Sequence, residues 1–159
     1  MRAVVQRCAR GSVTVDGTVV GALGPRGGLV VLLGVEVGDG TDEASKMADK
    51  LAKLRIFEDA SGKMNLAIGD VGGSLLVISQ FTLAGDCSGG NRPSFVRAAR
   101  PEVAEPLVEA VVARLRAPLP TGHGIEVETG RFRTEMKVDL LNDGPVTIVL
   151  DVQPRNSKE

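Results

Sequence analysis

Two short polar runs hold the residues of this sequence whose types and spacing could support chemistry. The first, Ser79-Gln80-Phe81-Thr82, closes an apolar stretch at residues 75–83 (LLVISQFTL). A hydroxyl or amide buried there needs a hydrogen-bond partner, because an unsatisfied buried polar group costs roughly 1–3 kcal/mol. The run is therefore either a binding site or a strand end whose polar groups are satisfied internally.

The second run is residues 142–147 (NDGPVT). Its spacing alone predicts a hairpin between two alternating strands, with the proline at the turn. The Gly144-Pro145 bond is the one in this run that could be cis, a form that about 5–6% of X-Pro bonds adopt in folded proteins.

Other reactive groups fit ordinary structural roles better than catalysis. His123 is the only histidine and lies in a flexible loop, so a multi-histidine metal site is excluded. Cys8 has the periodicity of a buried strand residue, and Cys87 follows Asp86 with no base at hand. The glycines of residues 24–28 precede a strand and are neither a phosphate loop nor a dinucleotide fingerprint. We therefore expect no metal and no cofactor.

The composition excludes several classes of protein. A chain of 159 residues, 43% hydrophobic and 25% charged, is long and apolar enough for one folded domain. The formal net charge of −1 argues against general DNA or RNA binding by positive charge. Residues 28–35 form the longest apolar stretch, far short of the roughly 20 residues that cross a membrane. Two distant cysteines without a CxxC pair favour a reducing, cytoplasmic setting.

The surrounding elements read as an α+β fold. The expected strands, including a hairpin at 12–23 and a strand at 29–35 covered on both faces, are residues 3–8, 12–23, 29–35, 75–83, 125–129, 136–141 and 145–152. One helix is expected at 41–56, capped by Thr41, and another at 101–116 with Pro106 in its first turn. We expect a single domain, residues 1–152, with a mostly antiparallel barrel-like β-sheet and two main helices, followed by a flexible tail at 153–159.

Taken in order along the chain, these segments resemble the D-aminoacyl-tRNA deacylases, also called D-tyrosyl-tRNA deacylases. The signature segments are SQFTL at 79–83 and NDGPVT at 142–147. The resemblance also rests on MRAVVQR at 1–7, SVTVDG at 12–17, LRIFED and GKMN within 54–65, DVGG at 70–73, RPSF at 92–95, VETGRF at 127–132 and MKVDL at 136–140. Each segment alone is weakly specific, and their order over about 150 residues makes the match strong.

The resemblance implies a hydrolase of translation quality control, which releases a D-amino acid, or glycine on the wrong tRNA, from the tRNA 3′ end. On this basis Ser79, Gln80, Phe81 and Thr82 line the pocket around the terminal adenosine and the scissile ester. Backbone N–H groups near the last two residues would form an oxyanion hole. Two mechanisms stay open, with Thr82 as nucleophile or with the tRNA 2′-hydroxyl helping to activate water. We favour the second, because the sequence offers no base to activate a threonine.

The resemblance further implies a homodimer with its site at the subunit interface. Gly144 and Pro145 would form a Gly-cisPro element that the partner subunit inserts, and Arg7 would hold that element. The carbonyl groups of the Gly-cisPro element would bind the substrate ammonium and leave no room for the side chain of an L residue, while glycine would still fit.

The sequence does not decide which residues contact the tRNA, and it leaves two other functions possible. Arg92, Arg97 and Arg100 lie in a segment without acidic residues, either as phosphate contacts or as an ordinary loop before a helix. The family usually carries more basic residues than this chain has at 87–91 (CSGGN), so tRNA affinity could be lower. The alternatives are a non-catalytic RNA-end or nucleotide-binding module, and a hydrolase of another activated ester such as a thioester.

Overall fold

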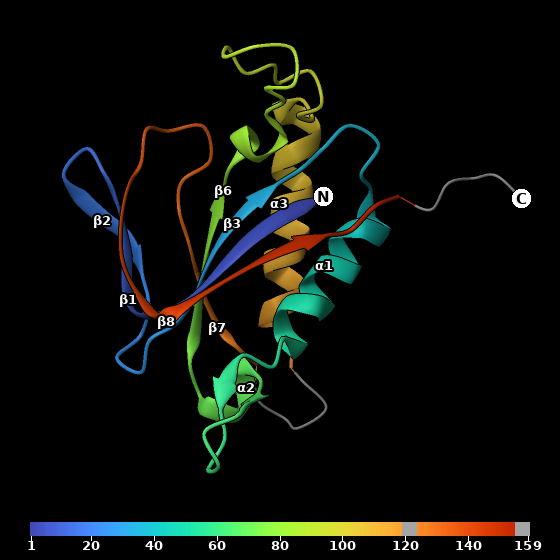
Figure 1. Ribbon diagram of the computed structural model, residues 1–159. Coiled ribbons are helices and arrows are strands. Elements are labelled where there is room, and N and C mark those ends of the chain that lie inside the picture. Colours follow the sequence, from blue (N-terminus) through green and yellow to red (C-terminus); the bar gives the residue numbers. More distant parts are fainter. Residues whose placement is uncertain (119–123, 155–159) are drawn as a thin grey trace, which may run out of the picture.

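The computed structural model describes residues 1–118 and 124–154 (Figure 1). In chain order the elements are β1 (Arg2–Val15), β2 (Thr18–Ala22), β3 (Gly28–Gly34), α1 (Thr41–Lys53), β4 (Phe57–Glu58), β5 (Met64–Leu66), α2 (Ile68–Val71), β6 (Ser74–Ser79), the 3-10 helix η1 (Phe81–Ala84), α3 (Pro101–Arg116), β7 (Glu126–Thr129) and β8 (Lys137–Asp151). None of the helices in these residues is long and apolar enough to span a bilayer. His123 and residues 155–159 of the expected tail lie outside the described residues.

The main sheet has six strands and confirms the α+β assignment. Strand β1 pairs antiparallel with β2, β3 and β8, whereas β3 pairs parallel with β6, and β6 with β7. Parallel neighbours need a long crossover, and α1 and α3 lie within these two connections. The expected dominance of antiparallel pairing thus holds for three of the five pairings in the main sheet.

The sheet bends until its two ends approach each other, which gives the expected barrel-like shape. The first half of β1 lies beside β3 and its second half beside β2. The backbone of β2 reaches β7, where a Cβ at Gly21 would overlap the carbonyl oxygen of Thr129. Figure 1 shows β2 and the adjoining parts of β1 and β8 turned away from the face that α1 and α3 cover.

Both faces of the central strands are buried, as the apolar stretch at 29–35 predicts. Leu29, Val31 and Leu33 of β3 pack with the helices in one core cluster, whereas Val30 packs into a second cluster on the opposite face. Alternate residues of β6 divide in the same way. This is the period-2 pattern of a strand covered on both sides.

The two main helices form where they were expected, with differences at their ends. Helix α1 begins at Thr41 but stops at Lys53, and its N-cap is Gly40 instead of Thr41. The Glu43 carboxylate reaches back from the first turn and accepts the Gly40 N–H at 3.0 Å. Helix α3 matches 101–116, but Pro106 lies beyond its first turn. The helix tolerates it because Pro106 is exposed, so water can reach the carbonyl that loses its donor.

The hairpin predicted at 142–147 is wrong. Residues on both sides of this segment pair with the same strand, Thr147 with Gln6 and Asn142 with Cys8, so β8 continues in one direction. Between these pairs, residues 143–146 stand opposite Arg7 alone. We call these four residues the β8 bulge. Spacing could not separate a bulge from a turn, because both interrupt the alternation of strand residues in the same way.

Gly28 should be indispensable to the parallel pairing that carries the first polar run. It pairs with Ser74, its φ is +155°, and a Cβ there would overlap the Ser74 carbonyl. Gly28→Ala should therefore lower the free energy of unfolding by about 2 kcal/mol or more, measured by urea denaturation. Gly89→Ala is the matched control, since a Cβ there meets nothing within 4 Å. Equal effects of the two changes would contradict this account.

Candidate active site

The first polar run (residues 79–82) lies where the chain leaves the sheet. Strand β6 ends at Ser79, and the Gln80 N–H still donates to the Leu33 carbonyl at 2.8 Å. The 3-10 helix η1 then begins at Phe81, so the strand predicted to reach residue 83 ends four residues earlier. The Gln80 side-chain amide donates a hydrogen bond to the Thr82 hydroxyl. The run is thus a tight corner that presents polar groups at the C-terminal ends of β3 and β6.

A mostly apolar pocket of about 690 Å³ opens beside this corner. Ser79, Gln80 and Phe81 line it, whereas Thr82 does not. The remaining lining residues are Leu33, Val35, Ile78, Phe95, Ala98, Ala99, Pro101, Ala104, Val108, Phe132, Arg133, Thr134, Met136 and Val138. The structure therefore brings three of the four predicted residues to one cavity, which has the size and the apolar character of a small-molecule site.

Phe95 is a pocket residue whose role the sequence did not reveal. Its ring meets Phe81 edge to face, with centroids 5.3 Å apart and planes at 69°. Phe81 is 59% exposed and Phe95 is 38% exposed, so the pair presents aromatic surface at the pocket. Phe95 is one of only four phenylalanines and lies in a polar loop, which is the sequence signal that could have marked it.

The β8 bulge is braced by Asn142. Its side-chain oxygen accepts the Val146 N–H at 3.0 Å, and its amide nitrogen donates to the Thr147 hydroxyl at 3.0 Å. These contacts bridge the base of the bulge. The Gly144-Pro145 bond at its tip is cis, and both residues are exposed.

Arg7 fastens the bulge to the rest of the molecule from the opposite strand. Its Nε donates to the Asp143 carbonyl at 3.2 Å, and its Nη1 donates to the Ile56 carbonyl at 2.8 Å. The side chain is buried, and the carboxylates of Glu58 and Asp143 each lie 4.0 Å from a guanidinium nitrogen. Arg7 therefore holds Asp143 and the turn after α1 in one arrangement, with its charge balanced by two acids.

Within one chain, the polar run and the β8 bulge lie apart. Ser79 is level with Leu33, which is level with Ala3 on β1, whereas the bulge stands opposite Arg7. Four residues of strand separate the two levels, or roughly 13 Å. None of the pocket-lining residues belongs to the bulge. The structure of a single chain thus keeps the two predicted parts of the site separate.

The described residues offer no histidine, thiolate or metal set at this pocket. Cys8 is buried, and burial raises the pKa of its thiol, which disfavours the nucleophilic thiolate. Cys87 is exposed, and the Ser88 backbone N–H lowers the pKa of the neighbouring Asp86 carboxyl. No group of three or more His, Cys, Asp or Glu residues within 1–118 and 124–154 could hold a metal ion.

The three arginines of the loop before α3 have different surroundings. Arg97 Nη2 donates to the Glu36 carboxylate at 2.9 Å, so its partner comes from a distant part of the sequence. Arg92 and Arg100 are exposed, and no ion pair involves them among the residues that the structure describes. Only these two are free of an acidic partner and able to meet a phosphate at no cost to the fold.

Comparison with known protein families gives a match over nearly the whole chain. The model of the family described as D-Tyr-tRNA(Tyr) deacylase matches residues 4–151. A D-aminoacyl-tRNA deacylase of Anaeromyxobacter dehalogenans is 60% identical over 151 residues, which cover 95% of this chain and 97% of that protein. A protein of the same name from Heliobacterium modesticaldum is 56% identical, with coverages of 95% and 96%.

Solved structures share the fold. One described as c-Myc DNA Unwinding Element Binding Protein superposes with a TM-score of 0.86 at 40% identity, over 97% of this chain and 100% of the other. A probable eukaryotic D-amino acid tRNA deacylase superposes with a TM-score of 0.76 over 95% of this chain and 98% of the other. Its sequence is 16% identical, so this second likeness concerns the fold alone.

Proposed function

This chain belongs to the D-aminoacyl-tRNA deacylase family, and from that premise we propose how its pocket and its β8 bulge work together. The chain is a hydrolase that removes D-amino acids from tRNA. We propose that it also clears glycine from mischarged tRNA, and that it works in the cytoplasm, where charged tRNAs are used. The observation that carries the proposal is the apolar pocket beside Ser79, Gln80 and Phe81.

The pocket suits the terminal adenosine of a tRNA and the ester attached to it. The exposed ring of Phe81 and the nearby Phe95 offer a surface on which a base can stack, as in other single-strand RNA sites. The N–H groups of Phe81 and Thr82 begin η1, where a helix leaves its first donors without internal acceptors. In our proposal these donors stabilise the oxyanion that forms when water attacks the ester carbonyl.

Hydrolysis in this site relies on positioning and on the substrate itself. The Thr82 hydroxyl lies outside the pocket lining and accepts a hydrogen bond from the Gln80 amide, which cannot remove its proton. An aminoacyl ester is already activated, so correct placement of a water molecule can supply much of the rate. We therefore assign the activation of water to the 2′-hydroxyl of the terminal ribose, with Ser79 and Gln80 orienting the ester.

The β8 bulge supplies the discrimination between D and L residues, and it acts on a second copy of the chain. Its carbonyl groups receive the substrate ammonium and exclude the side chain of an L residue, while glycine fits for lack of one. The separation of roughly 13 Å within one chain favours action on a partner's pocket. Strand β8 pairs with β1 alone among the described residues and exposes Leu141 and Val149, features that suit a dimer interface.

The activity is tested by incubating the protein with D-Tyr-tRNA and L-Tyr-tRNA and following the release of free tRNA. Release from the D ester at a rate at least about a hundredfold above the L ester is expected, because exclusion of a side chain costs several kcal/mol. Equal rates would overturn the chirality proposal. Binding without release would favour a non-catalytic RNA-end module, and cleavage of a simple thioester would favour a general esterase.

The role of the 2′-hydroxyl is tested by pairing a variant with a modified substrate. Thr82→Ala should retain kcat within about tenfold, whereas a tRNA ending in 2′-deoxyadenosine, charged at its 3′-hydroxyl, should lose about a hundredfold or more. Loss of all hydrolysis by Thr82→Ala, with tRNA binding intact in a filter assay, would instead make the threonine the nucleophile.

The assembly of the site from two subunits is tested by mixing two inactive variants. Ser79→Phe fills the pocket, and Gly144→Val forces the bulge out of shape, because a Cβ at Gly144 would lie 2.8 Å from Val146 Cγ2 and 3.1 Å from Arg7 Nη2. A mixed dimer contains one intact pair of pocket and bulge, so subunit exchange should restore about a quarter of the wild-type activity. Mixtures that stay inactive after verified exchange would show that each chain works alone.

A further inference from the structure

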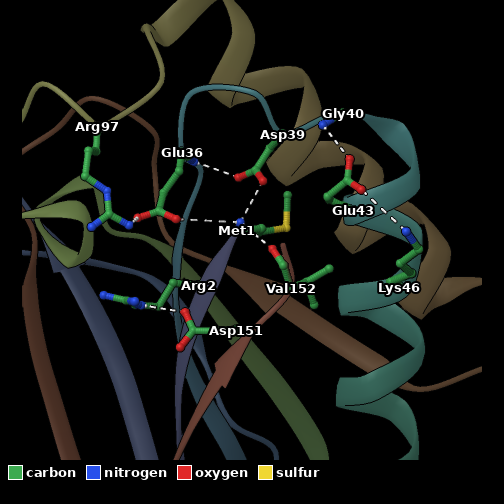
Figure 2. A network of polar contacts seen from close by, with 10 residues as sticks. All are labelled: Met1, Arg2, Glu36, Asp39, Gly40, Glu43, Lys46, Arg97, Asp151 and Val152. Carbon is green, nitrogen blue, oxygen red and sulfur yellow. Dashed lines mark hydrogen bonds and ion pairs between the residues drawn. The ribbon is translucent and has the colours of Figure 1, made fainter. Parts of the chain in front are cut away.

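Two buried carboxylates lie in the connection from β3 to α1, outside the corner formed by residues 79–82. Glu36 is 6% exposed and Asp39 is 8% exposed, and the proposed reaction uses neither of them. A buried carboxylate is costly unless it is paired and hydrogen bonded. Figure 2 shows Glu36 between Met1 and Arg97, and Asp39 close to the Met1 amino group.

The two acids form a continuous chain of polar contacts. The Met1 amino group donates to Asp39 Oδ1 at 2.7 Å and to the Val152 carbonyl at 2.8 Å. Asp39 Oδ2 accepts the Glu36 N–H at 2.7 Å, and Glu36 Oε1 accepts Arg97 Nη2 at 2.9 Å. The remaining oxygen of Glu36 lies 4.0 Å from the Met1 nitrogen. Glu36 is therefore held from behind by Asp39 and Met1, and Arg97 is the partner on its outer side.

Arg97 belongs to a short segment that forms one side of the pocket. The Val37 N–H donates to the Arg97 carbonyl at 2.9 Å, and the Ala99 N–H donates to the Val35 carbonyl at 3.0 Å. Glu36 and Ala98 form an antiparallel bridge between these two bonds. The segment 95–99 is thus laid beside 35–37 by two backbone hydrogen bonds and one side-chain ion pair.

The inner side of the same segment faces the substrate cavity. Phe95, Ala98 and Ala99 line the pocket together with Val35, and Phe95 meets Phe81 edge to face. Any shift of residues 95–99 away from 35–37 would move the Phe95 ring and widen the cavity. Two backbone bonds at an edge open easily, and a charge-assisted bond to a buried carboxylate is stronger than a neutral one.

We propose that Glu36 and Arg97 are positioning residues, whose ion pair fixes the pocket wall 95–99 so that Phe95 closes on the terminal adenosine. The proposal rests on the proposed function of this pocket. It also separates Arg97 from Arg92 and Arg100, since its guanidinium serves the wall instead of an RNA phosphate. Asp39 and the Met1 amino group hold Glu36 in one orientation, so the ion pair acts as a fixed anchor for an otherwise exposed loop.

The experiment compares Arg97→Gln, Arg97→Lys, Glu36→Gln and the double variant Glu36→Gln/Arg97→Gln. Arg114→Gln is the control, because the Arg114 side chain is about as exposed as that of Arg97 and its ion pair with Asp49, at 2.7 Å, lies away from the pocket. Steady-state kinetics on D-Tyr-tRNA are combined with amide hydrogen exchange at Val37 and Ala99. The exchange measurement needs no substrate and reports whether the wall stays attached.

Arg97→Gln should raise KM about tenfold with kcat within about twofold, and should speed exchange at Val37 and Ala99. Arg97→Lys should recover part of the KM loss, because it keeps the charge but loses the planar fork. The double variant should be no worse than Glu36→Gln, since each change breaks the same contact. Arg114→Gln should leave both KM and this exchange unchanged.

An unchanged KM or unchanged exchange in Arg97→Gln would overturn the proposal. Additive KM losses in the double variant would do the same, because they would show that Arg97 contacts the RNA directly. If Glu36→Gln does not fold, the two Arg97 variants decide the matter alone. If the wild-type chain hydrolyses no D-Tyr-tRNA, the proposed function fails, while the exchange result still decides whether the ion pair holds the wall.

Discussion

Strand β1 is the element on which the other strands near the site depend, because it shares backbone hydrogen bonds with β2, β3 and β8. A strand paired on both edges cannot slip by one residue without turning its buried side chains to the wrong face. Its register therefore sets where β3 ends beside Gln80 and where β8 leaves the sheet opposite Arg7. Strand β1 therefore keeps the corner at residues 79–82 and the β8 bulge at a constant separation.

The chemistry follows from what this arrangement places at the pocket. The corner at residues 79–82 offers a hydroxyl, an amide and the first N–H groups of η1. Such groups orient and stabilise but do not remove protons. This composition suits an ester that is already activated, where the substrate brings a reactive hydroxyl of its own and the protein contributes placement.

The charged side chains near the site act in local ion pairs, and the formal net charge of the chain is −1. Arg7 is buried against two carboxylates where it fastens the bulge, and Glu36 is buried where it meets Arg97 (Figure 2). In the proposed site, both arginines stabilise segments that would face the substrate. A near-neutral surface leaves binding to the shape of the pocket and to a few exposed groups, and this favours an RNA end over long duplexes.

The sequence by itself determined the elements and the family, because these depend on local patterns. A continuous apolar stretch predicted the strand β3, which is buried on both faces, and helical spacing located α1 and α3. The motifs at 79–83 and 142–147 indicated the deacylase family. Only the tertiary structure decided that the segment 142–147 contains a bulge in one strand, that Thr82 does not line the pocket, and that Arg97 pairs with Glu36. Each of these depends on a partner far away in the sequence, β1, β3 or the β3–α1 connection, and local spacing carries no information about such a partner.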